Sequence, residues 1–134
     1  MLGLCLGLAG SLWAFVPTDN FTLAWQHTIE KIRWEEDYRI LPKGLVLTKA
    51  RVKGTGAGME IPDNAVFSDG SWHYQPTLPI IPKLRLGRTP EAGDYDICFD
   101  QAGQVKCQAM ALWVGIPDKQ TAAVEIWGCE HTPL

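Results

Sequence analysis

FTLAWQHTIEKIRWEEDYRI, residues 21–40, alternates apolar and polar side chains with the period of a β-strand. Its first part places every second residue on one face, namely Phe21, Leu23, Trp25 and His27. Its second part has a mainly apolar face, made of Ile32, Trp34, Glu36, Tyr38 and Ile40. The opposite face is charged and consists of Arg33, Glu35, Asp37 and Arg39. A helix over residues 25–41 would leave Trp34 and Tyr38 off its apolar face, so the stretch predicts two strands.

Five further segments carry strand patterns of this kind. They cover residues 45–54, 82–87, 93–100, 105–114 and 121–129. Turns rich in Gly and Pro separate them, and a short strand is expected near WHYQ, residues 72–75, inside a long Pro-rich loop. Many short strands joined by such turns predict an all-β fold, either a small antiparallel β-sandwich or a partly open barrel.

The composition suits one globular domain. The chain has 134 residues, of which 46% are hydrophobic and 20% are charged. The formal net charge is −3, and the Lys and Arg residues are scattered without a basic stripe. This pattern argues against a nucleic-acid partner.

The N-terminal segment MLGLCLGLAGSLWAFV, residues 1–16, carries no charged side chain and is followed by Pro17. An apolar helix of this length would span about 24 Å of a hydrocarbon core about 30 Å thick. We therefore expect an N-terminal apolar helix that contacts the membrane through residues 2–16, as an anchor or a signal segment. A single β domain is expected over residues 17–134. A buried N-terminal segment is the remaining alternative, and both leading interpretations place the domain outside the cytoplasm.

The cysteines fit an exported chain. DYDICFDQAGQVKCQAMALWV, residues 94–114, predicts a hairpin with Ala102 and Gly103 at its tip. This register pairs Cys98 with Cys107 as a non-hydrogen-bonded pair, with Cα atoms about 4.5 Å apart, which a disulfide can bridge. Two free thiols, or a bond from Cys129 to one of them, are the alternatives. A disulfide would indicate an oxidising compartment.

His27 and Glu36 interrupt otherwise apolar strand faces, beside Trp25 and Trp34. Because a buried carboxylate is costly unless it is paired, the two residues could meet each other or a ligand. His27 and Glu30 point to opposite faces of a strand, so the segment offers zinc too few ligands and no metal site is expected. No nucleophile elbow, Cys/His dyad or paired-carboxylate signature is present, so neither catalytic residues nor a cofactor is predicted.

KGTGAGME, residues 53–60, is the other segment with a functional interpretation. It lacks the spacing of a phosphate-binding loop, and Pro62 leaves no room for the helix that such a loop needs. A glycine-rich turn is the simplest interpretation. The alternative is a loop whose backbone N–H groups bind a small anion, with Met59 as a soft apolar contact.

Three stretches together resemble the DUF1850 family of small bacterial proteins, over most of the chain after Pro17: FTLAWQHTIEKIRWEEDYRI (21–40), LVLTKARVKGTGAGME (45–60) and LRLGRTPEAGDYDICF (84–99). The family's His-[Ser/Thr]-[Val/Ile]-Glu segment and a following Glu are matched by His27, Thr28, Ile29, Glu30 and Glu36, and its Gly-Ala-Gly-Met stretch is matched by residues 56–59. Thr28 stands where Ser is more usual. No enzyme activity is attached to the family. Its members look like companions of the TAXI subgroup of tripartite (TRAP) transporters, which import organic acids with a periplasmic binding protein and an integral membrane subunit.

The resemblance implies a non-enzymatic accessory protein at the periplasmic side of the bacterial inner membrane, anchored or secreted. Its partner would be the TRAP membrane subunit or the periplasmic binding protein. The residues expected to contact a ligand or partner are His27, Thr28, Glu30, Trp34, Glu36, Gly56, Ala57, Gly58 and Met59. An independent small-ligand or metal-binding periplasmic module is the alternative, and a hydrolase or isomerase using His27 and Glu36 is a third.

Overall fold

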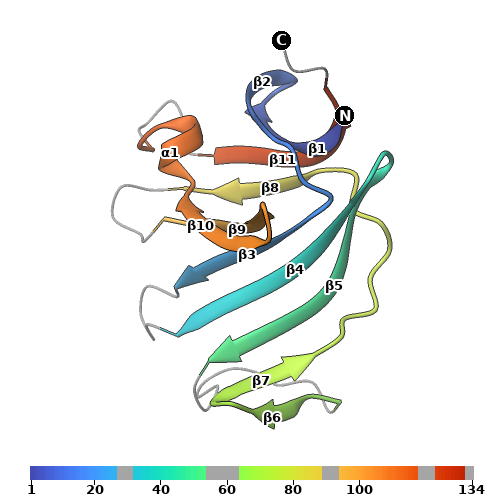
Figure 1. The fold of residues 1–134 in the computed structure, drawn as a ribbon, viewed down its shortest axis with the longest axis vertical. Helices are drawn as coiled ribbons and strands as arrows, with labels where there is room; N and C mark the ends of the chain where they lie inside the picture. The colour runs from blue at the N-terminus through green and yellow to red at the C-terminus, as the bar shows by residue number, and fades with distance from the viewer. Residues whose placement is uncertain (27–31, 54–63, 89–93, 118–122, 132–134) are drawn as a thin grey trace.

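The computed structural model describes residues 1–26, 32–53, 64–88, 94–117 and 123–131. These residues form two antiparallel sheets and the short helix α1 (Ala111–Val114) (Figure 1). No strand pair joins the two sheets within the described part of the chain, so they do not close into a barrel. The predicted all-β antiparallel sandwich is confirmed.

The larger sheet has seven strands, and its order differs from the order along the chain. From edge to edge they are β10 (Gln104–Ala109), β9 (Asp96–Gln101), β3 (Asn20–Gln26), β4 (Arg33–Leu41), β5 (Gly44–Lys53), β7 (Ser71–Tyr74) and β6 (Val66–Ser68). The smaller sheet has four strands in the order β2 (Ser11–Val16), β1 (Leu2–Leu8), β11 (Ala123–Glu130) and β8 (Leu84–Gly87). The strands expected from residues 21–54 and the short strand near residues 72–75 are confirmed as β3, β4, β5 and β7.

The core lies between the sheets. The smaller sheet contributes Leu4, Leu6, Val16, Leu86, Val124 and Ile126, and the larger sheet contributes Phe21, Leu23, Tyr38, Ile40, Leu45, Leu47 and Ile97. We call the face of the larger sheet that carries these side chains the inner face, and its opposite the outer face. The smaller sheet packs near the β4–β5 turn, where a Cβ atom at Gly128 would lie 2.5 Å from the carbonyl oxygen of Leu41. Strands β7 and β6 lie well away from it (Figure 1).

The helix predicted over residues 2–16 is wrong, because the segment forms strands β1 and β2. Leucine occupies every second position of β1, and Leu4 and Leu6 are completely buried in the core. The leucines alternate with Gly3, Cys5 and Gly7, so the apolar run has the two-residue period of a strand. The two glycines are also poor helix formers. Among the residues that the structure describes, no helix is long and apolar enough to span a membrane.

The β9–β10 hairpin has the predicted register. Gln104 pairs with Gln101, and Cys107 pairs with Cys98. Ala102 and Gly103 both have positive φ, at 55° and 84°, as a two-residue turn of type I′ requires. The predicted disulfide between Cys98 and Cys107 is confirmed, with Cα atoms 4.0 Å apart.

Two features of the C-terminal region differ from the sequence prediction. The strand expected over residues 105–114 ends at Ala109, and the chain then turns into α1 at the buried Met110, whose N–H donates to the carbonyl oxygen of Tyr95. Cys129 is bonded to Cys5, so β11 is joined covalently to β1. This second disulfide links the first and last strands of the fold.

Candidate functional site

Glu36 lies on the inner face of the larger sheet, in a row of otherwise apolar side chains. The register places Leu23 of β3 on one side of it and Ala50 of β5 on the other. Ala50 is paired in turn with Tyr74 of β7. Ala50, which is buried, therefore lies between Glu36 and Tyr74 in this row of the sheet.

Aromatic rings form the neighbouring row, toward the end of β3 and the start of β4. Trp25 and Trp34 are directly paired across the two strands, and their rings are stacked with centroids 6.0 Å apart and planes 4° apart. Tyr95, just before β9, packs at a tilt against Trp25 with centroids 6.0 Å apart. All three side chains are only partly buried. A carboxylate is therefore bordered by half-exposed aromatic rings.

Burial raises the pKa of Glu36 above its ordinary value, and a hydrogen bond from Tyr38 opposes the shift. The Tyr38 hydroxyl donates to Glu36 Oε1 over 2.9 Å. Burial raises the pKa of Tyr74 and of Tyr95. The negative charge of Glu36 adds to the increase for Tyr74, and the charge of Asp94, followed by that of Glu36, adds to the increase for Tyr95. Burial and the charge of Glu36 also raise the pKa of Tyr38. All three tyrosines of the chain therefore lie within the electrostatic reach of one carboxylate.

The outer face of the same strands carries ion pairs. Arg51 of β5 donates to Glu35 over 2.8 Å and to Asp37 over 2.9 Å. Glu35 also pairs with Arg33 at 3.2 Å, and Thr22 donates to Asp37 over 2.7 Å. Burial acts to raise the pKa of Glu35, but hydrogen bonds from the two arginines outweigh it and lower the pKa. The predicted charged face of β4 is thus confirmed and is internally paired.

Glu35→Gln and Glu36→Gln are expected to change stability in opposite directions at pH 7. The raised pKa of Glu36 means that its ionised form costs stability above that pKa, and the cost disappears below the ordinary value of 4.5. The lowered pKa of Glu35 means that it adds stability above 4.5, which is lost as pH falls through its folded-state pKa. Glu36→Gln should therefore stabilise the fold at pH 7, and Glu35→Gln should destabilise it by less than about 1 kcal/mol, because its ion pairs are partly exposed.

Urea unfolding of both variants and the wild type, at pH 7 and near pH 3, measures this. Both differences from the wild type should shrink at the acidic pH, because the contribution of each carboxylate is lost as it becomes protonated. Shifts of the same sign for the two variants at pH 7 would contradict these environments for Glu35 and Glu36.

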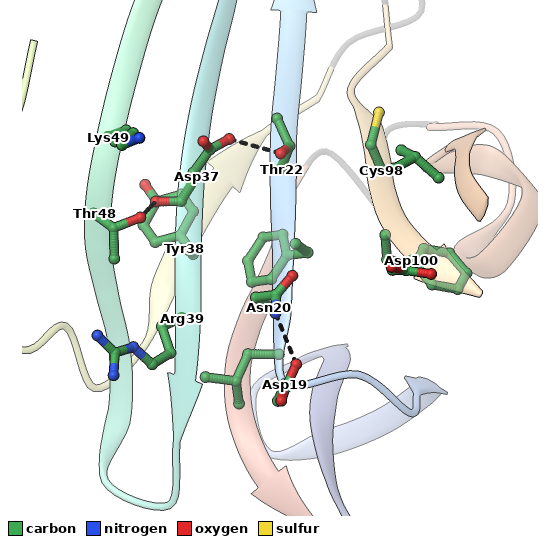
Figure 2. A pocket seen from close by; sticks show the side chains of 14 residues that line it. Asp19, Asn20, Thr22, Asp37, Tyr38, Arg39, Thr48, Lys49, Cys98 and Asp100 are labelled. Carbon is green, nitrogen blue, oxygen red and sulfur yellow. Dashed lines mark hydrogen bonds between the residues drawn. The ribbon is translucent and has the colours of Figure 1, made fainter. Parts of the chain in front are cut away.

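A groove of about 650 Å³ crosses the outer face between β5 and the β9–β10 hairpin (Figure 2). Its polar lining includes Thr22, Asp37, Lys49 and Asp100. Figure 2 shows Asp37 directed toward Thr22, which is paired with Cys98 on the neighbouring strand β9. Because Asp37 is already paired with Arg51, the groove presents compensated charges and not one strong charge of either sign.

The structure places two of the predicted contact residues together: Trp34 and Glu36 share the inner face of β4. The others lie outside the described residues, and so does the predicted pairing of His27 with Glu36; these residues are His27, Thr28, Glu30, Gly56, Ala57, Gly58 and Met59. Within the described part of the chain, no group of three or more His, Cys, Asp or Glu side chains could hold a metal ion.

Sequence reasoning missed the tyrosines around Glu36. The sequence predicts Tyr38 on the same face as Glu36, two residues away, and the structure shows its hydroxyl donating to the carboxylate. Tyr74 and Tyr95 come from segments far away in sequence, and only the strand order of the sheet brings them close to β4. No local signal in the sequence shows that order.

Comparison with known proteins identifies a family. Searches among curated proteins and among solved structures find no match. The model of the family described as "Domain of unknown function (DUF1850)" matches residues 21–104, which is more than half of the chain and includes strands β3 to β9 with the surroundings of Glu36. The chain therefore belongs to the DUF1850 family.

Proposed function

We propose that the chain is a non-enzymatic, exported accessory protein of a TAXI-type TRAP transporter, acting at the periplasmic side of the bacterial inner membrane. The observation that supports export of the chain is the pairing of all four cysteines into two disulfides. Disulfides persist in oxidising compartments such as the periplasm and are rare in the cytosol. Family membership supports the link to the transporter through the resemblance described above.

The free edge of β10 is the surface that we propose for the transporter partner. Among the described strands, β10 has only β9 as a neighbour, and Val105 on it is 74% exposed. The Cys98–Cys107 disulfide holds this hairpin together, which keeps the edge in an extended form. An extended segment of the partner could add to this edge as a further strand, beside the outer groove that Val105 helps to line.

Val105→Pro is expected to abolish binding of the partner while the hairpin stays intact. Val105 is opposite Asp100, two residues from the close Cys98–Cys107 pair, so it occupies a non-hydrogen-bonded position whose N–H points to the free edge. Proline removes that N–H without breaking a bond to β9. Val105→Thr is the matched control and should bind as the wild type does.

The measurement is co-purification of the tagged full chain with the TRAP membrane subunit and binding protein from detergent-solubilised membranes. The wild type and Val105→Thr should recover the transporter, and Val105→Pro should not. If all three variants bind equally, the β10 edge is not the contact. If the wild type recovers neither subunit, the accessory function is wrong.

A second candidate function, an independent small-ligand-binding module, is favoured by the inner face around Glu36. A partly buried carboxylate bordered by half-exposed aromatic rings has the composition of a small-molecule site, mainly apolar with a few polar groups.

A further inference from the structure

Strand β4 carries three consecutive acidic residues, Glu35, Glu36 and Asp37, whose surroundings differ. Glu35 and Asp37, on the outer face, are each bound to Arg51. Glu36, on the inner face, forms no ion pair with any Lys, Arg or His in the described part of the chain, and its hydrogen-bond donor there is the neutral Tyr38. Leaving a partly buried carboxylate without a counter-charge is unfavourable, so Glu36 would gain from a cation.

The groups around Glu36 suit a cation with an organic body. The Trp25 and Trp34 rings are stacked, Tyr95 packs on Trp25, and Tyr74 lies in the same row as Glu36, beyond Ala50 and within reach of its charge. Faces of aromatic rings attract cations, most strongly those of tryptophan, and their apolar surface also favours the hydrocarbon part of a ligand.

The arginine that acts on Tyr95 is held in an ion pair. Arg88 is within electrostatic reach of Tyr95, but its guanidinium is bound to Asp94 at 3.2 Å. An anionic ligand would be repelled by the charge of Glu36, and Arg88 is already bound to Asp94. A neutral ligand would leave that charge unpaired.

We propose that Glu36, with Trp25, Trp34, Tyr74 and Tyr95, binds a small organic cation of the alkylammonium class. The positive group lies against the carboxylate and the tryptophan faces, and the apolar body lies along the aromatic row. This inference rests on the second candidate function, the small-ligand module, and names the class of its ligand.

The test is isothermal titration calorimetry of the full, disulfide-bonded chain with benzyltrimethylammonium chloride, benzyl alcohol and sodium benzoate. These probes share a ring and differ in charge. Only the cation should bind the wild type. Glu36→Gln should weaken its binding by about tenfold or more, about 1.4 kcal/mol, because it removes the charge contact to the cation and leaves the tryptophan rings in place.

Glu35→Gln is the matched control, one residue away on the opposite face, and should change the affinity less than about twofold, as expected for a charge across the sheet in a screened position. Glu36→Asp keeps the charge and should retain more affinity than Glu36→Gln, which separates loss of charge from a folding defect. Binding should weaken as pH falls through the pKa of Glu36, and the other titratable groups facing it, Tyr38, Tyr74 and Tyr95, stay neutral throughout that range.

The probes distinguish failure of this inference from failure of the ligand module itself. If benzoate or benzyl alcohol binds as tightly as the cation and Glu36→Gln changes nothing, the cation class is wrong while a ligand module stands. If none of the three binds, both are overturned.

Discussion

Cys5→Ala combined with Cys129→Ala is expected to lower the free energy of unfolding by about 5 kcal/mol, the largest loss from any single cross-link. The two cysteines are 124 residues apart, so their bond closes a loop that contains nearly the whole chain. A longer closed loop restricts the unfolded chain more, and the stabilisation grows with the logarithm of the loop length. Alanine is the replacement because Cys5 is buried, and a hydroxyl there would lack a partner.

The control is Cys98→Ala combined with Cys107→Ala, whose bond closes a loop between residues only nine apart. The same relation gives a loss of about 3 kcal/mol for this loop. Urea unfolding at pH 7, read by far-UV circular dichroism, measures both variants against the wild type. An equal loss for the two pairs, or a larger loss for the hairpin pair, would show that loop length does not govern these cross-links.

The two disulfides also differ in how far the sequence reveals them. Cys98 and Cys107 flank a two-residue turn, and such a turn fixes the register of both strands, so their pairing follows from local spacing. Cys5 and Cys129 meet only because β1 lies beside β11 in the smaller sheet. The pairing of β1 with β11 depends on the topology of the whole chain, and the sequence near either cysteine does not indicate it.

The N-terminal segment shows a different limit. An uncharged run is compatible with a membrane helix and also with a buried strand, because both are apolar on all sides. The alternation of leucine with Gly3, Cys5 and Gly7 is the feature of this run that favours the strand. Once β1 has neighbours on both sides, its leucines fill the core and its small residues allow β2 to pack closely.

The candidate site was predictable in part for the same physical reason. The two-residue period of β4 places Glu36 on the apolar face beside Trp34, and the structure agrees. The smaller sheet covers the inner face near Tyr38 and Ile40, which are buried, and the row of Trp34 remains partly exposed. How much of one sheet is covered by another depends on strand lengths and packing, which a pattern of alternation does not contain.

Asp94→Ala is expected to lower the free energy of unfolding by about 3–5 kcal/mol, because it leaves a buried arginine without its counter-charge. The Arg88 side chain is 1% exposed and donates to Asp94 through Nε and Nη2. Its Nη2 also donates to the carbonyl oxygen of Gly115, its Nη1 has no hydrogen-bond partner, and Asp94 is its one ion-pair partner among the described residues. Asp94 also accepts hydrogen bonds from the backbone N–H groups of Tyr95 and Ala111, which fixes the start of β9 and of α1.

Asp96→Ala is the matched control, since this carboxylate is 38% exposed and its ion pair with Arg33 is longer, at 3.5 Å. It should cost less than about 1 kcal/mol. Adding Arg88→Met to Asp94→Ala should recover part of the loss, because an apolar side chain of similar length needs no counter-charge in a buried position. Equal losses from the two aspartate variants, or no recovery in the double variant, would mean that the backbone hydrogen bonds of Asp94, and not its charge, stabilise this region of the fold.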